Sequence, residues 1–474
     1  MHGIPAGLLD VARVVIISRQ ATERPSLART TEPARKERGA VLARCNAEEL
    51  SGERGGAVSR RTLWLLLAAV IGAFALTAAG CGGGNESTGT TAGTGGGEAK
   101  SVKIVSDLPL QGSSAAQTEQ MNNAIKLYLQ QIGNKVGNYS ISFEAFDDST
   151  AAKGAWDEAT CAANARKYVE DEAVVGVIGT FNSGCAKIEV PIANEASLAY
   201  VSPANTGVGL THTGPGAESG EPDKYYPNGT RNYARVVTPD DVQGQIDANY
   251  MKDKLGVKKV FILDDKDAYG KGVADAFEQA ANDIGLSVAG HEGWDANAQN
   301  YKALMTKVKS SGADGIFVGG ISCFNGGQLI KDKVAVVGDN DTVKTVVSDG
   351  FVQASLFDEA GADKVEGVYG TAPTLNPEDL PGAGKEFNAK VEQQFGKPEV
   401  YTAYAVAALQ MMLAALESSD GTREGVTGQL LKAQADTVVG PIKFDENGDP
   451  ADKFESVFQG KGGNWEFVEQ IAAP

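Results

Sequence analysis

Hydrophobic and polar positions follow two alternating periods from about residue 101 onward. Short apolar runs such as 173–179 are typical of strands that are covered on both faces. Between them, apolar side chains recur every three to four residues, which predicts helices. The expected strands are 102–106, 139–146, 173–179, 260–263, 286–291, 315–320 and 343–347. The expected helices are 117–131, 152–169, 240–254, 271–284, 299–311 and 325–334.

Strands that alternate with helices in this way predict βαβ units and parallel sheets. The series restarts after about residue 238, and the roughly 374 residues involved exceed the usual size of one hydrophobic core. We therefore expect an α/β fold with two doubly wound parallel-sheet lobes. Ligands of such sheets bind at the carboxyl ends of the strands. The loops expected there are 107–114, 180–184, 202–206, 264–270, 320–325 and 348–352.

The N-terminal region has a different pattern. Arg60 and Arg61 precede an uncharged, largely apolar run over 62–80, which ends at Cys81 and is followed by Gly, Ser and Thr. This order predicts an export signal at 58–80, lipidation of Cys81 and a flexible tether at 81–100. A transmembrane helix is the alternative reading of such a run. The small side chains before Cys81, and the tether in place of a charge cluster, favour the signal, although Ala78 stands where such signals usually have Leu.

Residues 1–57 are an unusual segment to find before an export signal. They are rich in Arg and have no sustained apolar period. We therefore interpret 1–57 as disordered, or as absent from the protein because translation starts near Val58.

The charge of the chain restricts its partners. There are 61 acidic and 43 basic residues, a formal net charge of −18; residues 1–61 hold 11 of the basic and 7 of the acidic ones and 62–80 hold none, so the chain from Cys81 onward carries a net charge of −22. Nucleic acids and anionic lipid surfaces bind basic patches, so neither is an expected partner.

Three cysteines remain after Cys45 and Cys81 are set aside. Cys161 and Cys185 are the natural disulfide pair in an oxidising compartment, with Cys323 free. The alternative is that all three are buried thiols. No CxxC motif or Cys/His cluster is present in the sequence, so we expect no metal site.

The predicted ligand loops lack the signatures of catalysis and of cofactor binding. Ser183 has no glycine two residues before it and no histidine placed to act as its base. No phosphate-binding GxxxxGK[ST] motif occurs, and the glycines at 214–220 do not follow a strand. We expect neither an enzyme nor a bound cofactor.

Two of these loops suit a zwitterion. Ser183 lies at a predicted helix start, where free N–H groups favour a carboxylate, and Asp349 follows a strand where it can meet an ammonium. The alternative is that Ser183 only caps its helix and Asp349 only anchors a turn.

Several ordered segments carry a family resemblance that runs from Val102 to the C-terminus. They include Val177–Gly179 with Ser183, Tyr200–Thr206, Arg235, Asp264–Gly272, Phe317–Gly320 and Thr437–Asp449. In these segments the chain resembles the periplasmic leucine/isoleucine/valine-binding proteins, the amino-acid receptors of branched-chain ABC transporters. The resemblance implies two lobes, joined by three crossovers, that close over an amino acid.

The resemblance also implies roles for six residues. By position, Ser183, Asn205 and Thr206 would hold the ligand carboxylate, partly through backbone groups, Tyr269 would reach in from the second lobe, and Asp349 would bind the ammonium. Ser322 falls where the family often has an aromatic residue. The first loop, 109–116, has no aromatic residue, Asp349 replaces a longer Glu, and 211–232 is an insertion near the cleft mouth. These departures leave an amino acid as the expected ligand and open the site to a more polar or larger one.

The implied crossovers divide the chain into 101–237 plus 371–440 for the first lobe and 238–370 plus 441–474 for the second. The function implied is a lipid-anchored receptor that delivers an amino acid to an ABC transporter permease. A sensor that signals to a membrane partner is the alternative, because it would use the same cleft. An envelope enzyme on this fold is a third class, which the missing base, nucleophile and metal cluster argue against.

Overall fold

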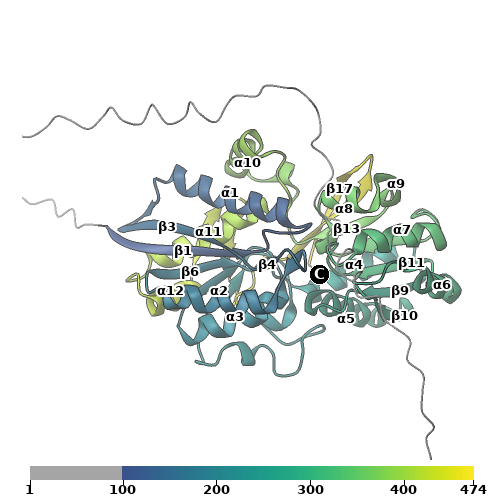
Figure 1. Cartoon of the computed structure of the whole chain (residues 1–474), viewed down its shortest axis with the longest axis horizontal. Coiled ribbons are helices and arrows are strands. Elements are labelled where there is room, and N and C mark those ends of the chain that lie inside the picture. Colours follow the sequence, from purple (N-terminus) through teal and green to yellow (C-terminus); the bar gives the residue numbers. More distant parts are fainter. Residues whose placement is uncertain (1–98, 474) are drawn as a thin grey trace, which may run out of the picture. The chain divides into compact units, whose positions relative to one another are not determined.

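The computed structural model describes residues 99–473 (Figure 1). The predicted signal at 58–80, the lipidation site and most of the tether lie outside the described residues. In 99–473 the regular elements form two large sheets with helices packed against them. None of the described helices is both long and apolar enough to cross a membrane.

The first sheet has the strand order β2-β3-β1-β6-β7-β8. All its neighbouring pairs are parallel except β2–β3. The six residues of β6 are all buried, as the apolar run at 173–179 predicted. The strands are β1 (Lys100–Leu108), β2 (Lys135–Val136), β3 (Tyr139–Asp147), β6 (Val174–Gly179), β7 (Ala199–Ser202) and β8 (Tyr233–Arg235).

Helices from two separate parts of the chain cover this sheet. Figure 1 shows α2 beside α3 and α1 beside α11, and α11 also packs against β6 and β7. Helix α11 is buried around most of its circumference because 13 of its 16 residues are buried. The helices are α1 (Ala115–Gln131), α2 (Glu158–Glu170), α3 (Ser183–Glu195), α10 (Gly382–Phe395), α11 (Thr402–Glu417) and α12 (Arg423–Leu430).

The second sheet has the order β10-β9-β11-β12-β13-β16-β17, with its last two pairs antiparallel. Its strands are β9 (Lys259–Asp264), β10 (Ser287–Gly293), β11 (Gly315–Gly319), β12 (Lys344–Val347), β13 (Tyr369–Ala372), β16 (Phe454–Lys461) and β17 (Asn464–Ala472). Its helices are α4 (Asp240–Asn249), α5 (Ala268–Asp283), α6 (Lys302–Ser311), α7 (Gly326–Val336), α8 (Ser355–Ala360) and α9 (Ala362–Val365).

The chain passes between the two sheets three times, after β8, after β13 and before β16. The last passage lies later than expected. A hairpin, β14 (Gln434–Thr437) with β15 (Gly440–Lys443), packs on the first lobe because Ile442 and Phe444 join its core. The expected boundary at 440/441 is therefore wrong, and the exchange takes place between Phe444 and Phe454.

Two expected helices differ from the structure. The helix predicted at 152–169 begins only at Glu158, because Asp157 caps it by accepting hydrogen bonds from the amides of Ala159 and Thr160. The preceding residues form a short hairpin of β4 (Ser149–Thr150) and β5 (Ala155–Trp156). The helix predicted at 240–254 is α4 followed by a π-helical segment, Tyr250–Lys254.

The insertion at 211–232 belongs to the first lobe and also reaches the second. Tyr225 and Tyr226 are buried in the same core cluster as α3 residues. Gly216 has φ +87°, and a Cβ there would lie 2.5 Å from the carbonyl oxygen of Gly272 in α5. A side chain at this position would push the insertion away from the second lobe.

A disulfide joins Cys161 of α2 to Cys185 of α3, which are 24 residues apart. A cross-link of this span restricts the unfolded chain and contributes about 3 kcal/mol to the free energy of unfolding. We expect the double variant Cys161→Ala/Cys185→Ala to lose about that amount in urea denaturation.

Cys323→Ala is the matched control, because Cys323 is not disulfide-bonded among residues 99–473. It should shift the midpoint less than the double variant does. Alkylation of Cys161 in denatured, unreduced protein would show that the bond does not form.

Candidate functional site

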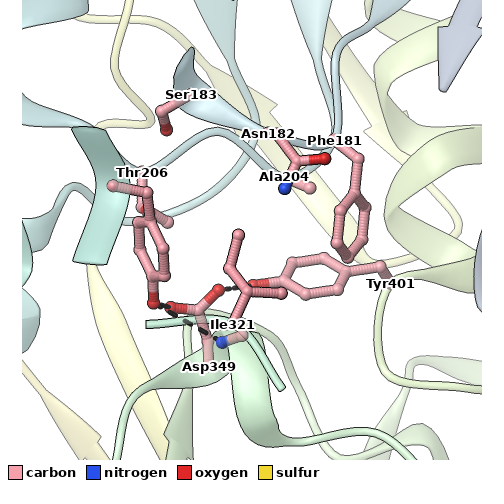
Figure 2. A pocket seen from close by; sticks show the side chains of 10 residues that line it. Phe181, Asn182, Ser183, Ala204, Thr206, Ile321, Asp349 and Tyr401 are labelled. Atoms are coloured by element: carbon pink, nitrogen blue, oxygen red, sulfur yellow. Dashed lines mark hydrogen bonds between the residues drawn. The ribbon is translucent and has the colours of Figure 1, made fainter. Parts of the chain in front are cut away.

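A cavity lies where the carboxyl ends of strands from both sheets meet (Figure 2). The space between atoms here is about 260 Å³, a volume that includes the open solvent at the mouth of the cavity. The first lobe contributes residues that follow β6 and β7 and one at the start of α11. The second lobe contributes residues from the start of α5 and from the loops after β11 and β12. The lining residues are Phe181, Asn182, Ser183, Ala204, Thr206, Tyr269, Ile321, Asp349, Gly350 and Tyr401.

Four of the six residues predicted to bind ligand line this cavity, namely Ser183, Thr206, Tyr269 and Asp349. They come from four separate loops and from both lobes. These loops lie close together because each follows the carboxyl end of a parallel strand, where ligand sites form in such sheets.

The carboxylate of Asp349 accepts hydrogen bonds from both lobes. The hydroxyl of Tyr269 donates to Oδ1, and the hydroxyl of Tyr401 donates to Oδ2 at 2.6 Å (Figure 2). With its amide oriented by the surrounding hydrogen bonds, Gln243 donates from its nitrogen to Oδ1 at 3.1 Å. Asp349 is thus held by neutral donors, and no basic side chain is among the ten lining residues.

Burial raises the pKa of Asp349, and the hydrogen bonds from Tyr269, Tyr401 and Gln243 oppose that rise. Burial raises the pKa of both tyrosines as well, so they remain protonated donors near neutral pH. A buried carboxylate without a cationic partner is destabilised. A ligand ammonium would supply the missing positive charge.

The start of α3 faces the same cavity. Asn182 precedes the helix without capping it by a side-chain hydrogen bond. The first helical bond runs from the Ala186 amide to the Asn182 carbonyl, and the amides of Ser183 and Gly184 have no acceptor among residues 99–473. The Ser183 hydroxyl accepts from the Gly207 amide at 3.2 Å. Free amides at the start of a 13-residue helix suit a carboxylate.

Thr206 adds a hydroxyl to this end of the cavity. Its side chain is 1% exposed, and its Oγ1 has no hydrogen-bond partner among residues 99–473. Its carbonyl accepts from the amide of Asp240 at 2.9 Å, which fixes the loop at the start of α4.

Asn205 lies behind the cavity wall. Its side chain donates to the carbonyl of Phe181 at 3.0 Å and accepts from the hydroxyl of Tyr233 at 3.2 Å. Its carbonyl accepts from Arg235. The side chain therefore positions the loop that carries Phe181, and a backbone contact of Asn205 with the ligand stays a prediction.

Ser322 also lies outside the lining, directly after Ile321, which lines the cavity. It is 1% exposed, and its hydroxyl accepts from the amide nitrogen of Gln353 at 2.6 Å. The structure therefore places it at the edge of the cavity with a polar neighbour.

Six lining residues were not predicted as ligand contacts: Phe181, Asn182, Ala204, Ile321, Gly350 and Tyr401. Phe181 and Tyr401 pack edge to face with ring centroids 5.7 Å apart. Ile321 is fixed by its amide, which donates to the buried carboxylate of Asp265 at 2.9 Å. Phe181 lies in the loop 180–184, which was predicted to contact ligand. Tyr401 comes from a distant part of the chain, and no sequence motif surrounds it.

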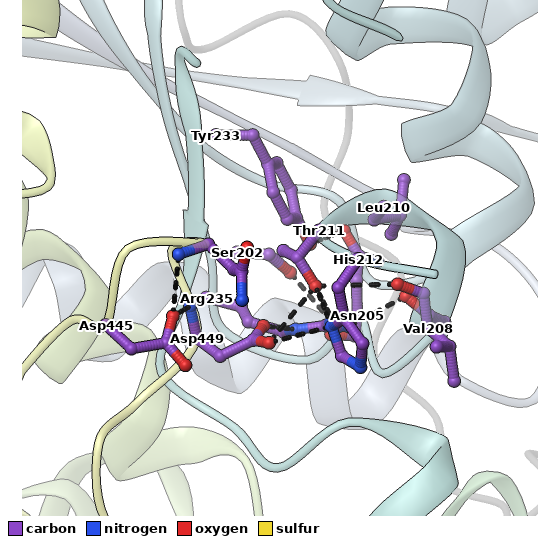
Figure 3. Close-up of polar contacts among 12 residues, drawn as sticks. Ser202, Asn205, Val208, Leu210, Thr211, His212, Tyr233, Arg235, Asp445 and Asp449 are labelled. Carbon is purple, nitrogen blue, oxygen red and sulfur yellow. Dashed lines mark hydrogen bonds and ion pairs between the residues drawn. The ribbon is translucent and has the colours of Figure 1, made fainter. Parts of the chain in front are cut away.

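A buried ion pair supports the first-lobe loops (Figure 3). Arg235 at the end of β8 donates from Nε to Asp449 at 2.6 Å, and both side chains are almost completely buried. Arg235 also donates to the carbonyls of Asn205 and Gly207 and to the hydroxyl of Thr211. Burial alone would raise the pKa of Asp449, but the Arg235 charge holds it well below its usual range.

His212 extends this network to the second lobe. Its Nδ1 lies 3.1 Å from Asp449 and its Nε2 lies 3.0 Å from Asp241 in α4. Burial lowers the pKa of His212, but the hydrogen bonds to Asp241 and Asp449 outweigh it and raise the pKa to about 9. His212 is therefore protonated at neutral pH and bridges two carboxylates.

A comparison with known protein families identifies the chain. The model of the family described as "Periplasmic binding protein" matches residues 101–463. The chain belongs to this family. Among curated proteins it is similar to a Leu/Ile/Val-binding protein homolog 2 of Brucella abortus (strain 2308), with 30% identity over 350 residues, 72% of this chain and 86% of the relative.

Solved periplasmic binding protein structures share the fold. One is the substrate binding protein LivJ of Streptococcus pneumoniae in complex with isoleucine, with TM-score 0.67, 22% identity, and coverage of 79% of this chain and 100% of that one. Another is a solute binding protein of R. palustris in complex with benzoate, with TM-score 0.65, 21% identity, and coverage of 79% and 97%. These similarities confirm the predicted α/β fold class.

The His212 bridge predicts a pH dependence of stability. Its folded pKa of about 9 lies above the ordinary value of 6.5. The stabilisation is therefore complete below pH 6.5 and is lost as the pH rises through 9. We expect the melting temperature to fall between pH 7 and 9.5, with 1 kcal/mol corresponding to roughly 2 °C.

His212→Gln should flatten this dependence. His291→Gln is the comparison variant, because His291 also has a raised pKa but lies away from the cavity, beside Asp264 and Glu278. Equal slopes for His212→Gln and the unmodified protein would contradict the bridge.

Proposed function

We propose that this protein captures an amino acid between its two lobes and delivers it to the permease of an ABC transporter. The observation that carries the proposal is the buried Asp349, held by Tyr269 and Tyr401 across the cavity from the start of α3. A zwitterion satisfies both ends of such a site.

The ammonium of the ligand is assigned to Asp349. It would pair with the buried carboxylate, whose present partners are neutral donors. The ligand carboxylate is assigned to the free amides of Ser183 and Gly184, with the Thr206 hydroxyl beside them. Both interactions are charge-assisted and enclosed, which strengthens them.

The names of related proteins agree with an amino acid. The relatives include proteins named for leucine, isoleucine and valine and an "Amino acid binding protein" of Pseudomonas aeruginosa. The fold also occurs with benzoate, which has a carboxylate and no amine. Asp349 favours an amine-bearing ligand, because its carboxylate would repel the carboxylate of a ligand that has no amine.

Delivery to a permease follows from the same relatives. The isoleucine complex is that of a branched-chain amino acid transporter substrate binding protein. We assign this chain to the outside of the cytoplasmic membrane, with Cys81 lipidated and residues 81–100 as its tether. Sensing would use the same cleft, and no specific observation favours it.

Asp349→Asn tests the assignment of the ammonium. The substitution keeps the shape and removes the charge, so affinity for amino acids should fall at least about 30-fold, equivalent to about 2 kcal/mol. Isothermal titration calorimetry of the full-length protein with a panel of amino acids measures this. Ligand carried through purification is first removed in guanidinium, followed by refolding.

Asp363→Asn is the control, because Asp363 is an exposed acid of the same lobe. It should leave affinity unchanged. Unaltered binding by Asp349→Asn would overturn the assigned role, and absence of heat with every amino acid at millimolar concentration would overturn the amino-acid function.

Cys81→Ser tests the anchor. The serine variant lacks the thiol that lipidation requires, so labelled palmitate should no longer enter the protein. The protein should move from the membrane fraction to the soluble fraction. Continued membrane association without label would support the transmembrane alternative.

A further inference from the structure

A cluster of polar side chains adjoins the cavity beyond Ile321 and Gly350. It contains Ser322, Gln353 and three further residues from both lobes. The amide nitrogen of Gln353 donates to the Ser322 hydroxyl at 2.6 Å and to the Gly350 carbonyl at 3.2 Å. The Ser322 amide donates to the same carbonyl at 3.2 Å. This cluster, which we call the polar subsite, comprises Ser113, Ser322, Gln353, Ser355 and Glu359.

The polar subsite spans the two lobes. Ser113 lies in the first-lobe loop between β1 and α1, whereas Glu359 is in α8 of the second lobe. Burial raises the pKa of Glu359 to about 7, and hydrogen bonds from the hydroxyls of Ser355, Ser113 and Ser322 oppose that rise. The subsite is therefore made of residues from both lobes.

Four buried polar atoms of this cluster have no hydrogen-bond partner of good geometry among residues 99–473. They are Ser113 Oγ, Gln353 Oε1, Ser355 Oγ and Glu359 Oε1. Gln353 is only 4% exposed, so its carbonyl oxygen is well removed from bulk solvent. Buried polar atoms are rarely left unpaired, so a group from outside the chain is expected to bond with them.

The chemistry of these atoms selects a donor. Carboxylate and amide oxygens only accept hydrogen bonds, and serine hydroxyls accept as readily as they donate. Because burial raises the pKa of Glu359 to about 7, a cation beside its carboxyl would favour the ionised form, and the exposed Asp358 is the acid next to it. An aliphatic side chain here would bring no donor to the Gln353 and Glu359 oxygens.

We propose that the polar subsite binds the side chain of the ligand and selects amino acids whose side chain ends in an ammonium or guanidinium group. This inference rests on the proposed amino-acid function, which places the ligand backbone between Asp349 and α3. Ser113, Gln353, Ser355 and Glu359 supply the acceptors, and Ile321 contacts the aliphatic part of the side chain.

The sequence offers a reason why the proposed preference for a cationic side chain would differ from that of leucine-type relatives. The first loop, 109–116, carries Ser113 and Ser114 and has no aromatic residue, although the resemblance leads one to expect an aromatic residue in this loop. An aromatic ring there would cover an apolar side chain. A serine in its place exposes the ligand side chain to Glu359 and its neighbours.

Calorimetry of the refolded full-length protein with L-arginine, L-lysine, L-glutamine and L-leucine tests the proposal. At least one of arginine and lysine should bind about 100-fold tighter than leucine, because a site built to bond a polar group rejects analogues that lack it. Glu359→Gln should weaken that binding at least about 30-fold, whereas the adjacent exposed control Asp358→Asn should not change it.

Ser113→Ala supplies a second variant in the other lobe and should weaken arginine or lysine binding about tenfold, which keeps the proposal testable if Glu359→Gln does not fold. Leucine as the preferred ligand, or glutamine tighter than both cations, would overturn the subsite while leaving the amino-acid function standing. Binding of none of the four, nor of any other amino acid, would overturn the proposed function itself.

Discussion

The buried ion pair between Arg235 and Asp449 is the interaction on which the geometry of this protein depends. Its two residues lie at crossings between the lobes, one at the end of β8 and the other before β16. The guanidinium also binds the carbonyls of Asn205 and Gly207, so the loop that presents Thr206 is held from behind. Removal of one partner from such a pair costs about 3–5 kcal/mol, because the other charge stays buried.

The hydrogen-bond and charge partners of Asp449 differ from those of Asp349, which lines the cavity that this ion pair supports. Asp449 has its full complement of cationic partners, whereas Asp349 has hydroxyl and amide donors alone. The two carboxylates are similarly buried, so their different surroundings separate structural from binding chemistry. One stabilises the fold, and the other is held ready for a charge that the chain does not provide.

The repeating strands and helices were predictable because their apolar periods reflect burial that is local to each element. The ligand loops were also predictable, since the carboxyl ends of parallel strands meet at one edge, and Ser183, Thr206, Tyr269 and Asp349 share a cavity as a result. Side-chain direction was not predictable. Asn205 turns toward Phe181 and Tyr233, a choice made by packing between loops.

Contacts between distant segments account for most of the other differences between the predictions from sequence and the structure. Tyr401 reaches the cavity only because α11 is buried in the first lobe, and nothing near it in the sequence marks this. The polar subsite likewise depends on Ser113 and Glu359, which meet across the two lobes. The helix expected from 152 begins at 158 because a side-chain cap at Asp157 overrides the local pattern.

The bond from Tyr401 to Asp349 has a consequence for the equilibrium between open and closed forms. Tyr401 is anchored in the first lobe and Asp349 belongs to the second, so the lobes cannot separate without breaking this bond. This hydrogen bond therefore lowers the free energy of the closed form without any ligand, and it raises the fraction of unliganded protein that is closed. A transporter that recognises the closed form would then encounter some unloaded receptors, and the ligand has to act through the difference in its affinity for the two forms.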